Sequence, residues 1–134
     1  MSKDILSEVN RGKSKNGNKF ESFFEEKTGL KKLLKKEKPT IVNEHGVKQI
    51  ADFDFLWEKS GVKNWIDVTT SYRSDRAKQK AYNGLIAKKI DPNCIIWMVV
   101  GDFVHNKRVQ KPTSLEGLDK TIHIDEFLEQ YSNE

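Results

Sequence analysis

The stretch IADFDFLWEKSGVKNWIDVTTSYRSDRAKQKAY (residues 50–82) carries the clearest structural pattern in the chain. Its first part alternates apolar and polar residues, as a strand with one buried face does. Ser60-Gly61 has the chemistry of a tight turn, and a second strand-like run follows it. Ser74, or the residue after it, can cap a helix that runs to about Ile90. The stretch therefore predicts a strand, a turn, a second strand and a helix.

Alternation along these two strands sorts their side chains into faces. In the first strand Asp52 and Asp54 share one face. The opposite face is apolar and consists of Ala51, Phe53, Phe55 and Trp57. In the second strand Asp67 shares a face with Trp65 and Thr69, and Ile66 and Val68 take the other. An antiparallel pair would then have one apolar face and one face carrying Asp54 and Asp67. Carboxylates placed together repel one another and are tolerated when a divalent cation lies between them.

The predicted order of elements resembles the PD-(D/E)xK nuclease superfamily. That superfamily has a carboxylate at one strand, an acid-x-Lys pattern on the next strand and a helix after it. Phe53-Asp54-Phe55-Leu56 resembles its PD-hydrophobic element, and Asp67-Val68-Thr69 resembles its (D/E)xK element. The resemblance covers about residues 17–104. Two positions depart from the pattern, since Phe53 replaces the usual Pro and Thr69 replaces the usual Lys. The resemblance implies an α/β fold with a mixed central β-sheet flanked by helices, the restriction endonuclease-like core.

The resemblance also implies a function, a metal-dependent DNA endonuclease that hydrolyses phosphodiester bonds. Asp54 and Asp67 would bind Mg²⁺, for which Mn²⁺ can substitute, with the Val68 carbonyl as a third oxygen ligand. Asp52 shares the face of Asp54 and stays an alternative ligand. A second class stays open, a catalytically inactive nuclease-like fold that binds nucleic acid or a protein. Thr69 favours this second class, and the Asp54/Asp67 pair favours the enzyme.

The lysine of this family orients the attacking water and neutralises charge on the phosphate. Thr69 supplies no cation, although its hydroxyl can hold a water molecule, so it stays a catalytic candidate. Lys78 or Lys80, on the helix that follows the second strand, can project to the same place. We favour Lys78, because it lies beside Tyr82 and off the small-residue face with which the helix packs.

An earlier helix supplies one more candidate. Asn18 can cap this helix, and Gly29 follows its last residue as a stop signal. The run from Gly17 to Glu21 resembles the Gly-x-x-x-Glu start of the first helix in many of these nucleases, where the Glu points to the metal site. Glu21 is therefore a catalytic candidate, and the alternative is a solvated helix residue.

The rest of the chain fits the same order of elements. Residues 30–38 have leucines at helical spacing among five lysines, which is consistent with a short amphipathic helix. Residues 94–103 lack alternation, which predicts a central strand buried on both faces. The other predicted elements are strands at 40–42, 47–57 and 121–124, a turn at His45-Gly46 and a last helix that starts at Asp125.

The charge distribution suits a polyanionic partner, and DNA is the partner we expect. The formal net charge is +4 and the pI is about 9.1. Residues 113–134 hold one basic and six acidic residues, so the basic excess lies before them. Three basic residues at the start of the second helix, Arg73, Arg76 and Lys80, are the candidates for DNA contacts.

The length of 134 residues predicts a single nuclease-like domain, over residues 18–134. Residues 1–17 are rich in Lys, Ser, Asn and Gly and have few apolar residues, which predicts a flexible basic segment. A single cysteine, Cys94, excludes an intrachain disulfide and fits a cytoplasmic location. The longest apolar run is too short to span a bilayer, so no membrane partner is expected. In the nucleases that the chain resembles, one active site generally cuts one DNA strand. The resemblance therefore implies that a small enzyme reaches both strands as a homodimer.

Overall fold

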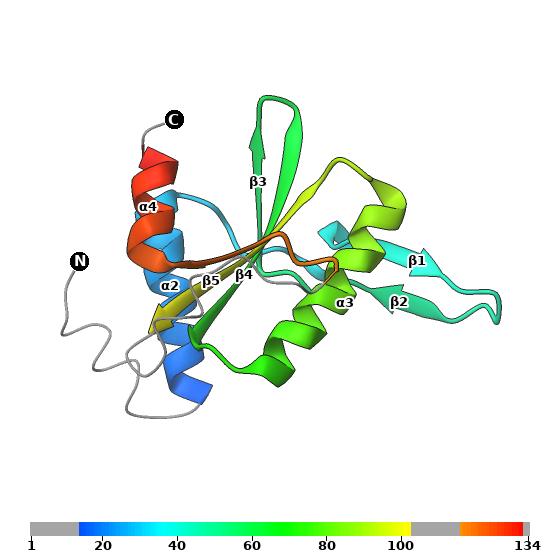
Figure 1. Ribbon diagram of the computed structural model, residues 1–134, viewed down its shortest axis with the longest axis horizontal. Helices are drawn as coiled ribbons and strands as arrows, with labels where there is room; N and C mark the ends of the chain where they lie inside the picture. Colours follow the sequence, from blue (N-terminus) through cyan, green and yellow to red (C-terminus); the bar gives the residue numbers. More distant parts are fainter. Residues whose placement is uncertain (1–13, 103–115, 133–134) are drawn as a thin grey trace.

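The computed structural model describes residues 14–102 and 116–132 (Figure 1). The helices are α2 (Ser14–Thr28), α3 (Ser74–Ile90) and α4 (Ile124–Ser132), with a 3-10 turn η1 (Lys35–Glu37). The strands are β1 (Thr40–Val42), β2 (Lys48–Ile50), β3 (Phe55–Lys59), β4 (Val62–Ser71), β5 (Ile95–Asp102) and β6 (Lys120–His123). In the described part of the chain, no helix has the length and apolar character needed to cross a membrane.

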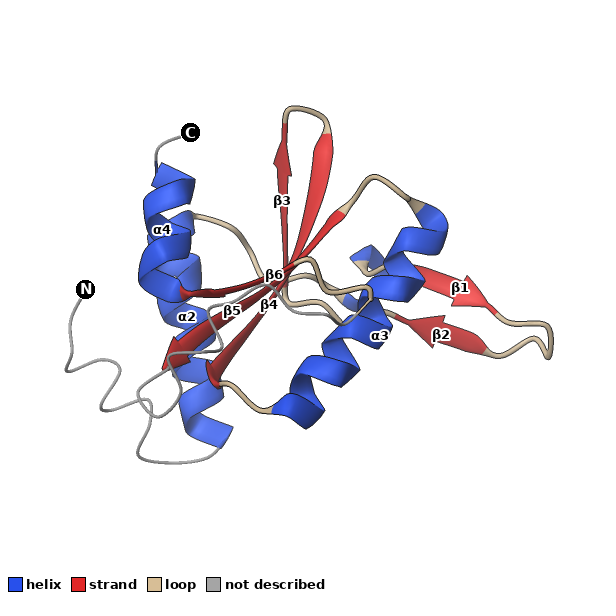
Figure 2. Cartoon of the chain, viewed as in Figure 1, coloured by secondary structure: helices blue, strands red, loops and turns tan. Residues whose placement is uncertain are grey.

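A four-stranded sheet in the order β3-β4-β5-β6 forms the centre of the protein. The β3–β4 pair is an antiparallel hairpin, whereas β4 pairs with β5, and β5 with β6, in parallel. Helices α2 and α4 contribute to the core on one face of this sheet, and α3 contributes to the core on the other (Figure 2). The predicted α/β class, a mixed central sheet flanked by helices, is confirmed. The double cover also explains why β5 shows no alternation, because both of its faces are buried.

Strand β4 has the face assignment that alternation predicts. Ile66 and Val68 pack in the core under α2 and α4, whereas Trp65 packs in the core under α3. Asp67 and Thr69 alternate with the first pair and are buried as well. The face that carries Asp67 is covered by α3.

Residues 47–57 do not form one strand, and this prediction is wrong. Strand β2 ends at Ile50 and pairs only with β1, in a separate hairpin that lies against α3 (Figure 1). Residues 51–54 link it to β3, and two of their N–H groups, those of Ala51 and Phe53, donate to Pro39 O and Ala51 O. This link crosses from one core to the other. Ala51 and Phe53 pack under α3, whereas Phe55 and Trp57 pack under α2 and α4.

Two predictions near the N-terminus also need correction. Helix α2 begins at Ser14, so Asn18 lies inside the helix rather than at its cap, and residues 14–17 are helical. Residues 1–13 of the predicted flexible segment lie outside the described residues. Residues 30–38 form an irregular segment with one 3-10 turn instead of an amphipathic helix. Leu30 and Leu33 still pack against the cores, while Leu34 is 59% exposed.

Candidate functional site

Asp54 and Asp67 meet where β3 begins beside the middle of β4. Asp54 directly precedes β3, and its N–H donates to Ile66 O at 3.0 Å. Its carboxylate oxygen Oδ2 accepts the N–H of Val68, also at 3.0 Å. The backbone of Asp54 thus bonds one neighbour of Asp67, and its side chain bonds the other. The register of the β3–β4 hairpin, in which Phe55 pairs with Ile66, places Asp54 beside the stretch of β4 that carries Asp67.

Asp67 is a buried carboxylate without hydrogen bonds. Its side chain is 1% exposed, and neither of its oxygens accepts a hydrogen bond from the described residues. The ammonium of Lys80 on α3 lies 3.3 Å from Oδ1 and forms an ion pair with it. Burial raises the pKa of Asp67 well above its ordinary value, and the nearby charge of Lys80 only partly opposes this effect. A bound cation or a proton would supply the partner that the protein does not.

Asp54 is also shifted toward its protonated form. Burial is the main cause of its raised pKa, and the Val68 N–H opposes it by favouring the carboxylate. The negative charge of Glu21 raises the pKa of Asp54 further. The charge of Glu21 thus raises the pKa of Asp54, and the charge of Asp54 raises the pKa of Asp67, which is the electrostatic condition that a bound cation relieves.

Glu21 lies on α2, and its role at a metal site stays a prediction. Its Oε1 lies 2.6 Å from the ammonium of Lys32, and the pair lies at the protein surface. The hydrogen bond to Glu21 is the main cause of the raised pKa of Lys32, and the charges of Asp54 and Asp52 add to it. Lys32 was missed as a site residue, because its run of lysines has the pattern of a solvated helix face.

The structure separates the two alternative ligands of the first strand. Asp52 is 71% exposed and pairs with Lys38, which lowers its pKa through a side-chain hydrogen bond. Asp54 is much less accessible and lies directly against β4. Asp54 therefore lies directly against the β4 backbone beside Asp67, and the choice of Asp54 over Asp52 as a ligand stays a prediction.

The structure brings Lys80, rather than the favoured Lys78, to the carboxylates. Lys78 is exposed, and in the described part of the chain it forms no ion pair. It shares its side of α3 with Tyr82, whose hydroxyl accepts a hydrogen bond from Gln49 of β2. Helical periodicity explains the difference, because Lys80 lies next to the buried Ala77 and Ala81 and so faces the sheet.

The other candidates lie at the ends of β4 and α3. The Thr69 hydroxyl donates to Ser71 O at 3.0 Å, so its hydrogen is used within the strand end. Arg73 is exposed and pairs with Asp75 at 3.2 Å, and Arg76 is also exposed. The two arginines therefore lie at the surface near the start of α3, the helix that carries Lys80.

The donor set fits one hard cation with open coordination positions. In the described residues, no three His, Cys, Asp or Glu side chains form a group that could hold a metal ion. Mg²⁺, however, is commonly held by one or two carboxylates, with water and substrate oxygens as the other ligands. Two such carboxylates are present, those of Asp54 and Asp67, and among the described residues the Lys80 ammonium is the charged partner of the Asp67 oxygens, which accept no hydrogen bond. The Val68 carbonyl opens toward Asp54, because the N–H and C=O of one strand residue point to the same side.

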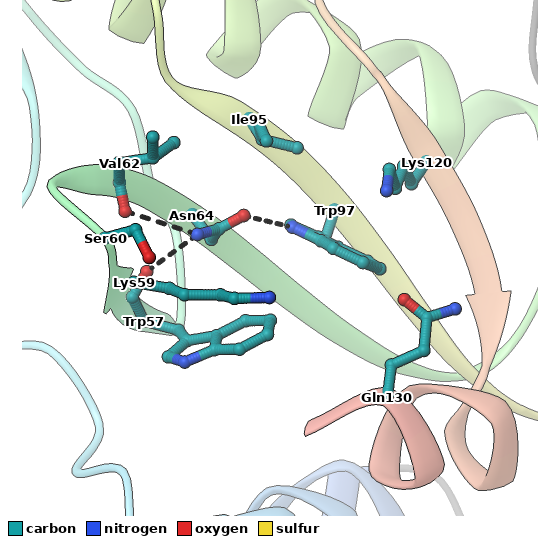
Figure 3. A pocket seen from close by; sticks show the side chains of 9 residues that line it. All are labelled: Trp57, Lys59, Ser60, Val62, Asn64, Ile95, Trp97, Lys120 and Gln130. Atoms are coloured by element: carbon teal, nitrogen blue, oxygen red, sulfur yellow. Dashed lines mark hydrogen bonds between the residues drawn. The ribbon is translucent and has the colours of Figure 1, made fainter. Parts of the chain in front are cut away.

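A hollow lies on the face of the sheet opposite to Asp67, and its chemistry differs from that of the carboxylates (Figure 3). Its volume is about 260 Å³, and its lining consists of Trp57, Lys59, Ser60, Val62, Asn64, Ile95, Trp97, Lys120 and Gln130. No carboxylate is among these residues, so the hollow offers no ligands of the kind that a hard cation needs. The ammonium of Lys120 lies 4.6 Å from the ring centre of Trp97, and that of Lys59 lies 5.8 Å from that of Trp57.

Comparison with known proteins finds a distant structural similarity. The chain resembles the small subunit of the heterodimeric restriction endonuclease R.BspD6I, with 12% sequence identity and a TM-score of 0.48. The matched region covers 98% of this chain and 77% of that subunit. No protein-family model and no curated protein matches the chain.

Proposed function

We propose that the protein is a metal-dependent DNA endonuclease that hydrolyses phosphodiester bonds. One observation carries the proposal: Asp67 is fully buried beside a second carboxylate and has two oxygens without a hydrogen-bond donor. Leaving a charged group in this state is costly for stability, and such sites concentrate where function requires them. The order of elements around Asp54 and Asp67, which is strand, tight turn, strand and helix, supports the same proposal.

Mg²⁺ is the cation that we propose for this site, and Mn²⁺ can substitute for it. Asp54 and Asp67 would hold it together with the Val68 carbonyl. When bound, such a cation neutralises charge on a phosphate and makes a bound water a stronger nucleophile at neutral pH.

The chain itself would supply positive charge and a dry environment. A cation held by Asp67 would weaken the attraction between Asp67 and Lys80, whose ammonium lies 3.3 Å away. That ammonium could then stabilise the negative charge that grows on the phosphate oxygens in the transition state. Helix α3 would keep bulk water from the buried side of the pair. Thr69, which stands at the usual lysine position, would leave this role to Lys80.

DNA would bind along the surface next to the start of α3. Arg73 and Arg76 are exposed there, and the basic excess of residues 1–112 favours a polyanion. A homodimer would place one site on each strand, and we keep it as part of the proposal, together with a cytoplasmic location. Light scattering with and without DNA tests the dimer, and a monomer mass in both samples would favour a nickase.

A plasmid assay tests the proposed activity. Supercoiled DNA is incubated with the full chain and Mg²⁺ or Mn²⁺, and a parallel sample contains EDTA. We expect nicked or linear DNA with either metal and intact supercoiled DNA with EDTA. Conversion that continues in EDTA would contradict the metal site, and intact DNA under all conditions would contradict the enzyme.

Thr69 favours one alternative, a nuclease-like fold that binds DNA without cutting it. Its hydroxyl is bonded to Ser71 O, and no lysine stands at its position. The same plasmid samples, run on a gel under native conditions, would separate the two functions. Retarded but uncut DNA would favour the binding module.

A further inference from the structure

The hollow of Figure 3 is built by the register of the central sheet and bordered by the last turn of α4. Trp57 of β3 pairs with Asn64 of β4, and Trp97 of β5 pairs with Lys120 of β6. Paired residues point to the same face of a sheet, so these four side chains meet there. Helix α4 adds Gln130. We call this place the tryptophan hollow, and its volume is about 260 Å³.

The floor of the tryptophan hollow offers ring surface rather than hydrogen bonds. The indole N–H of Trp97 already donates to Asn64 Oδ1 at 2.9 Å, and the Asn64 amide donates to Trp57 O at 3.1 Å. Phe127 contacts both indole rings edge to face, with 5.7 Å and 5.2 Å between ring centres, and so helps to fix them. A ligand that enters the hollow therefore meets fixed aromatic surface, and its polar groups must find partners at the rim.

The rim of the tryptophan hollow is positively charged. Lys59 and Lys120 are exposed, and none of the described residues that line the hollow is acidic. The Lys120 ammonium lies 4.6 Å from the centre of the Trp97 ring, and the Lys59 ammonium lies 5.8 Å from that of Trp57. Aromatic rings pack at the same distances, so a planar ring could take the place of either ammonium. Gln130 adds an amide that both donates and accepts.

Positive charge at the rim and aromatic surface at the floor together define the ligand. The two lysines would repel a cation, and a small inorganic anion would leave the indole rings unused. An anion that carries a planar ring uses both features, because its charge draws the ammonium groups and its ring stacks on the indole that they uncover. Proteins that bind unpaired nucleotides combine these features, a basic surface and aromatic side chains.

We propose that the tryptophan hollow binds one unpaired nucleotide, with the base on Trp57 or Trp97 and the phosphate at the ammonium groups of Lys59 and Lys120. A free nucleoside monophosphate and one unit of a single DNA strand present this same chemistry. The volume is slightly below that of pockets for drug-sized ligands, which suits one base. The site goes beyond the proposed cleavage, because it lies on the face of the sheet opposite to Asp67 and needs no metal.

Nuclear magnetic resonance of the indole N–H groups in the full chain tests the proposal. The chain has three tryptophans, and Trp65, which packs in the core under α3, is the internal control. The isotope-labelled protein is titrated with thymidine monophosphate, thymidine, inorganic phosphate and a short single strand of thymidines. All titrations contain EDTA, so metal at the carboxylates does not contribute.

Thymidine monophosphate should shift the signals of Trp57 and Trp97 and leave that of Trp65 unchanged. It should bind at least about 10-fold more tightly than thymidine or phosphate alone, because stacking and charge both contribute. The proposal holds for either source of the nucleotide. Tighter binding of the single strand would identify the strand as the source, and equal affinities would identify the free nucleotide.

One variant separates the tryptophan hollow from the general positive charge of the protein. Lys120→Gln should lower the affinity for thymidine monophosphate about 10-fold, since it removes a charged partner of the phosphate. Lys63→Gln is the matched control, because Lys63 is exposed on β4 and is not part of the lining. It should keep the affinity of the unmodified protein.

Three results would overturn the proposal. Thymidine monophosphate could leave the signals of Trp57 and Trp97 unchanged, or thymidine or phosphate alone could bind as tightly as the monophosphate. Equal affinities of Lys120→Gln and Lys63→Gln for the monophosphate would have the same consequence. None of these results bears on the endonuclease proposal, which the plasmid assay tests separately.

Discussion

Two buried polar residues of β4, three positions apart, have opposite environments. Asn64 faces α2 and α4, and both ends of its side chain have partners. Its Oδ1 accepts the indole N–H of Trp97 at 2.9 Å, and its amide donates to Trp57 O at 3.1 Å and Val62 O at 3.3 Å (Figure 3). Asp67 faces α3 and accepts no hydrogen bond from the described residues.

The contrast distinguishes a buried polar side chain that stabilises the fold from one that is available to bind a ligand. The three hydrogen bonds of Asn64 fix an indole ring and the β3–β4 hairpin, so its burial serves the fold. Nothing comparable compensates the burial of Asp67, apart from one ammonium at 3.3 Å. A buried acid that the fold does not satisfy is a candidate for binding a cation, and the satisfied amide three residues away shows that the same strand can satisfy polar groups.

The largest expected effect is on the cleavage rate after removal of one carboxylate. Asp67→Asn keeps the volume of the side chain but removes the charge that would hold the cation. We expect a loss of at least on the order of 1,000-fold in Mg²⁺-dependent cleavage, the upper end of the range for one stabilising group. Asp54→Asn should act alike. Plasmid cleavage at the wild-type rate by either variant would refute the site assignment, and far-UV circular dichroism checks that both variants are folded.

A smaller effect on the cleavage rate is expected from removal of the Lys80 ammonium, which faces Asp67. Lys80→Ala should lower the cleavage rate about 100-fold, since Lys80 is the donor proposed for the transition state. Lys78→Ala is its matched control, because it changes the same residue type on an exposed side of the same helix. Single-turnover rates at saturating enzyme separate this effect from DNA binding. Equal rates for the two variants would remove the catalytic role of Lys80.

Asn64, whose hydrogen bonds hold the fold together, should affect stability rather than the cleavage rate. Asn64→Leu would leave the Trp97 indole N–H and the Trp57 and Val62 carbonyl oxygens without their partner. We expect a loss of about 2 kcal/mol in the free energy of unfolding, the cost of buried groups left without hydrogen bonds. Urea unfolding measures it, with the exposed Lys63→Gln on the same strand as the control. Cleavage by the folded fraction should continue, and loss of cleavage with unchanged stability would reverse the roles of the two residues.

Alternation predicted the faces of β4 but failed two residues before β3. Within one continuous strand the period of two holds, so Ile66 and Asp67 fall on opposite faces as expected. The link at residues 51–54 breaks that continuity, and Phe53 and Phe55 end in different cores although they are two apart. Sequence alone shows four apolar residues at even spacing and does not show that the backbone turns between them. Asp54 still contacts β4, because its N–H and its carboxylate bond the backbone of Ile66 and Val68.

The lysines could not be assigned from their positions in the sequence. Lys78 and Lys80 both lie in the first two turns of α3, and the direction of each depends on how the helix packs against the sheet. Ala77 and Ala81 predicted the packing face, and Lys80 lies at its border and reaches Asp67 with its long side chain. Lys32 lies 11 residues from Glu21, in a segment without regular structure, so no periodic pattern connects them.

The last effect that we predict is a dependence of stability on pH, which for each pH unit is smaller than the effect of Asn64→Leu. Burial raises the pKa of Asp67 in the folded protein, whereas the unfolded chain has an ordinary carboxyl pKa of about 3.9. Above about pH 4 the folded state therefore binds more protons than the unfolded state, and the stability falls as the pH rises until the folded pKa is passed, by up to about 1.4 kcal/mol per pH unit. Asp67→Asn cannot titrate, so in EDTA its unfolding free energy should change less between pH 4 and pH 8, whereas Asp75→Asn, at an exposed position, should follow the unmodified protein. Parallel pH profiles for Asp67→Asn and the unmodified protein would show that Asp67 is ionised at no cost, and the contrast with Asn64 would then lose its electrostatic basis.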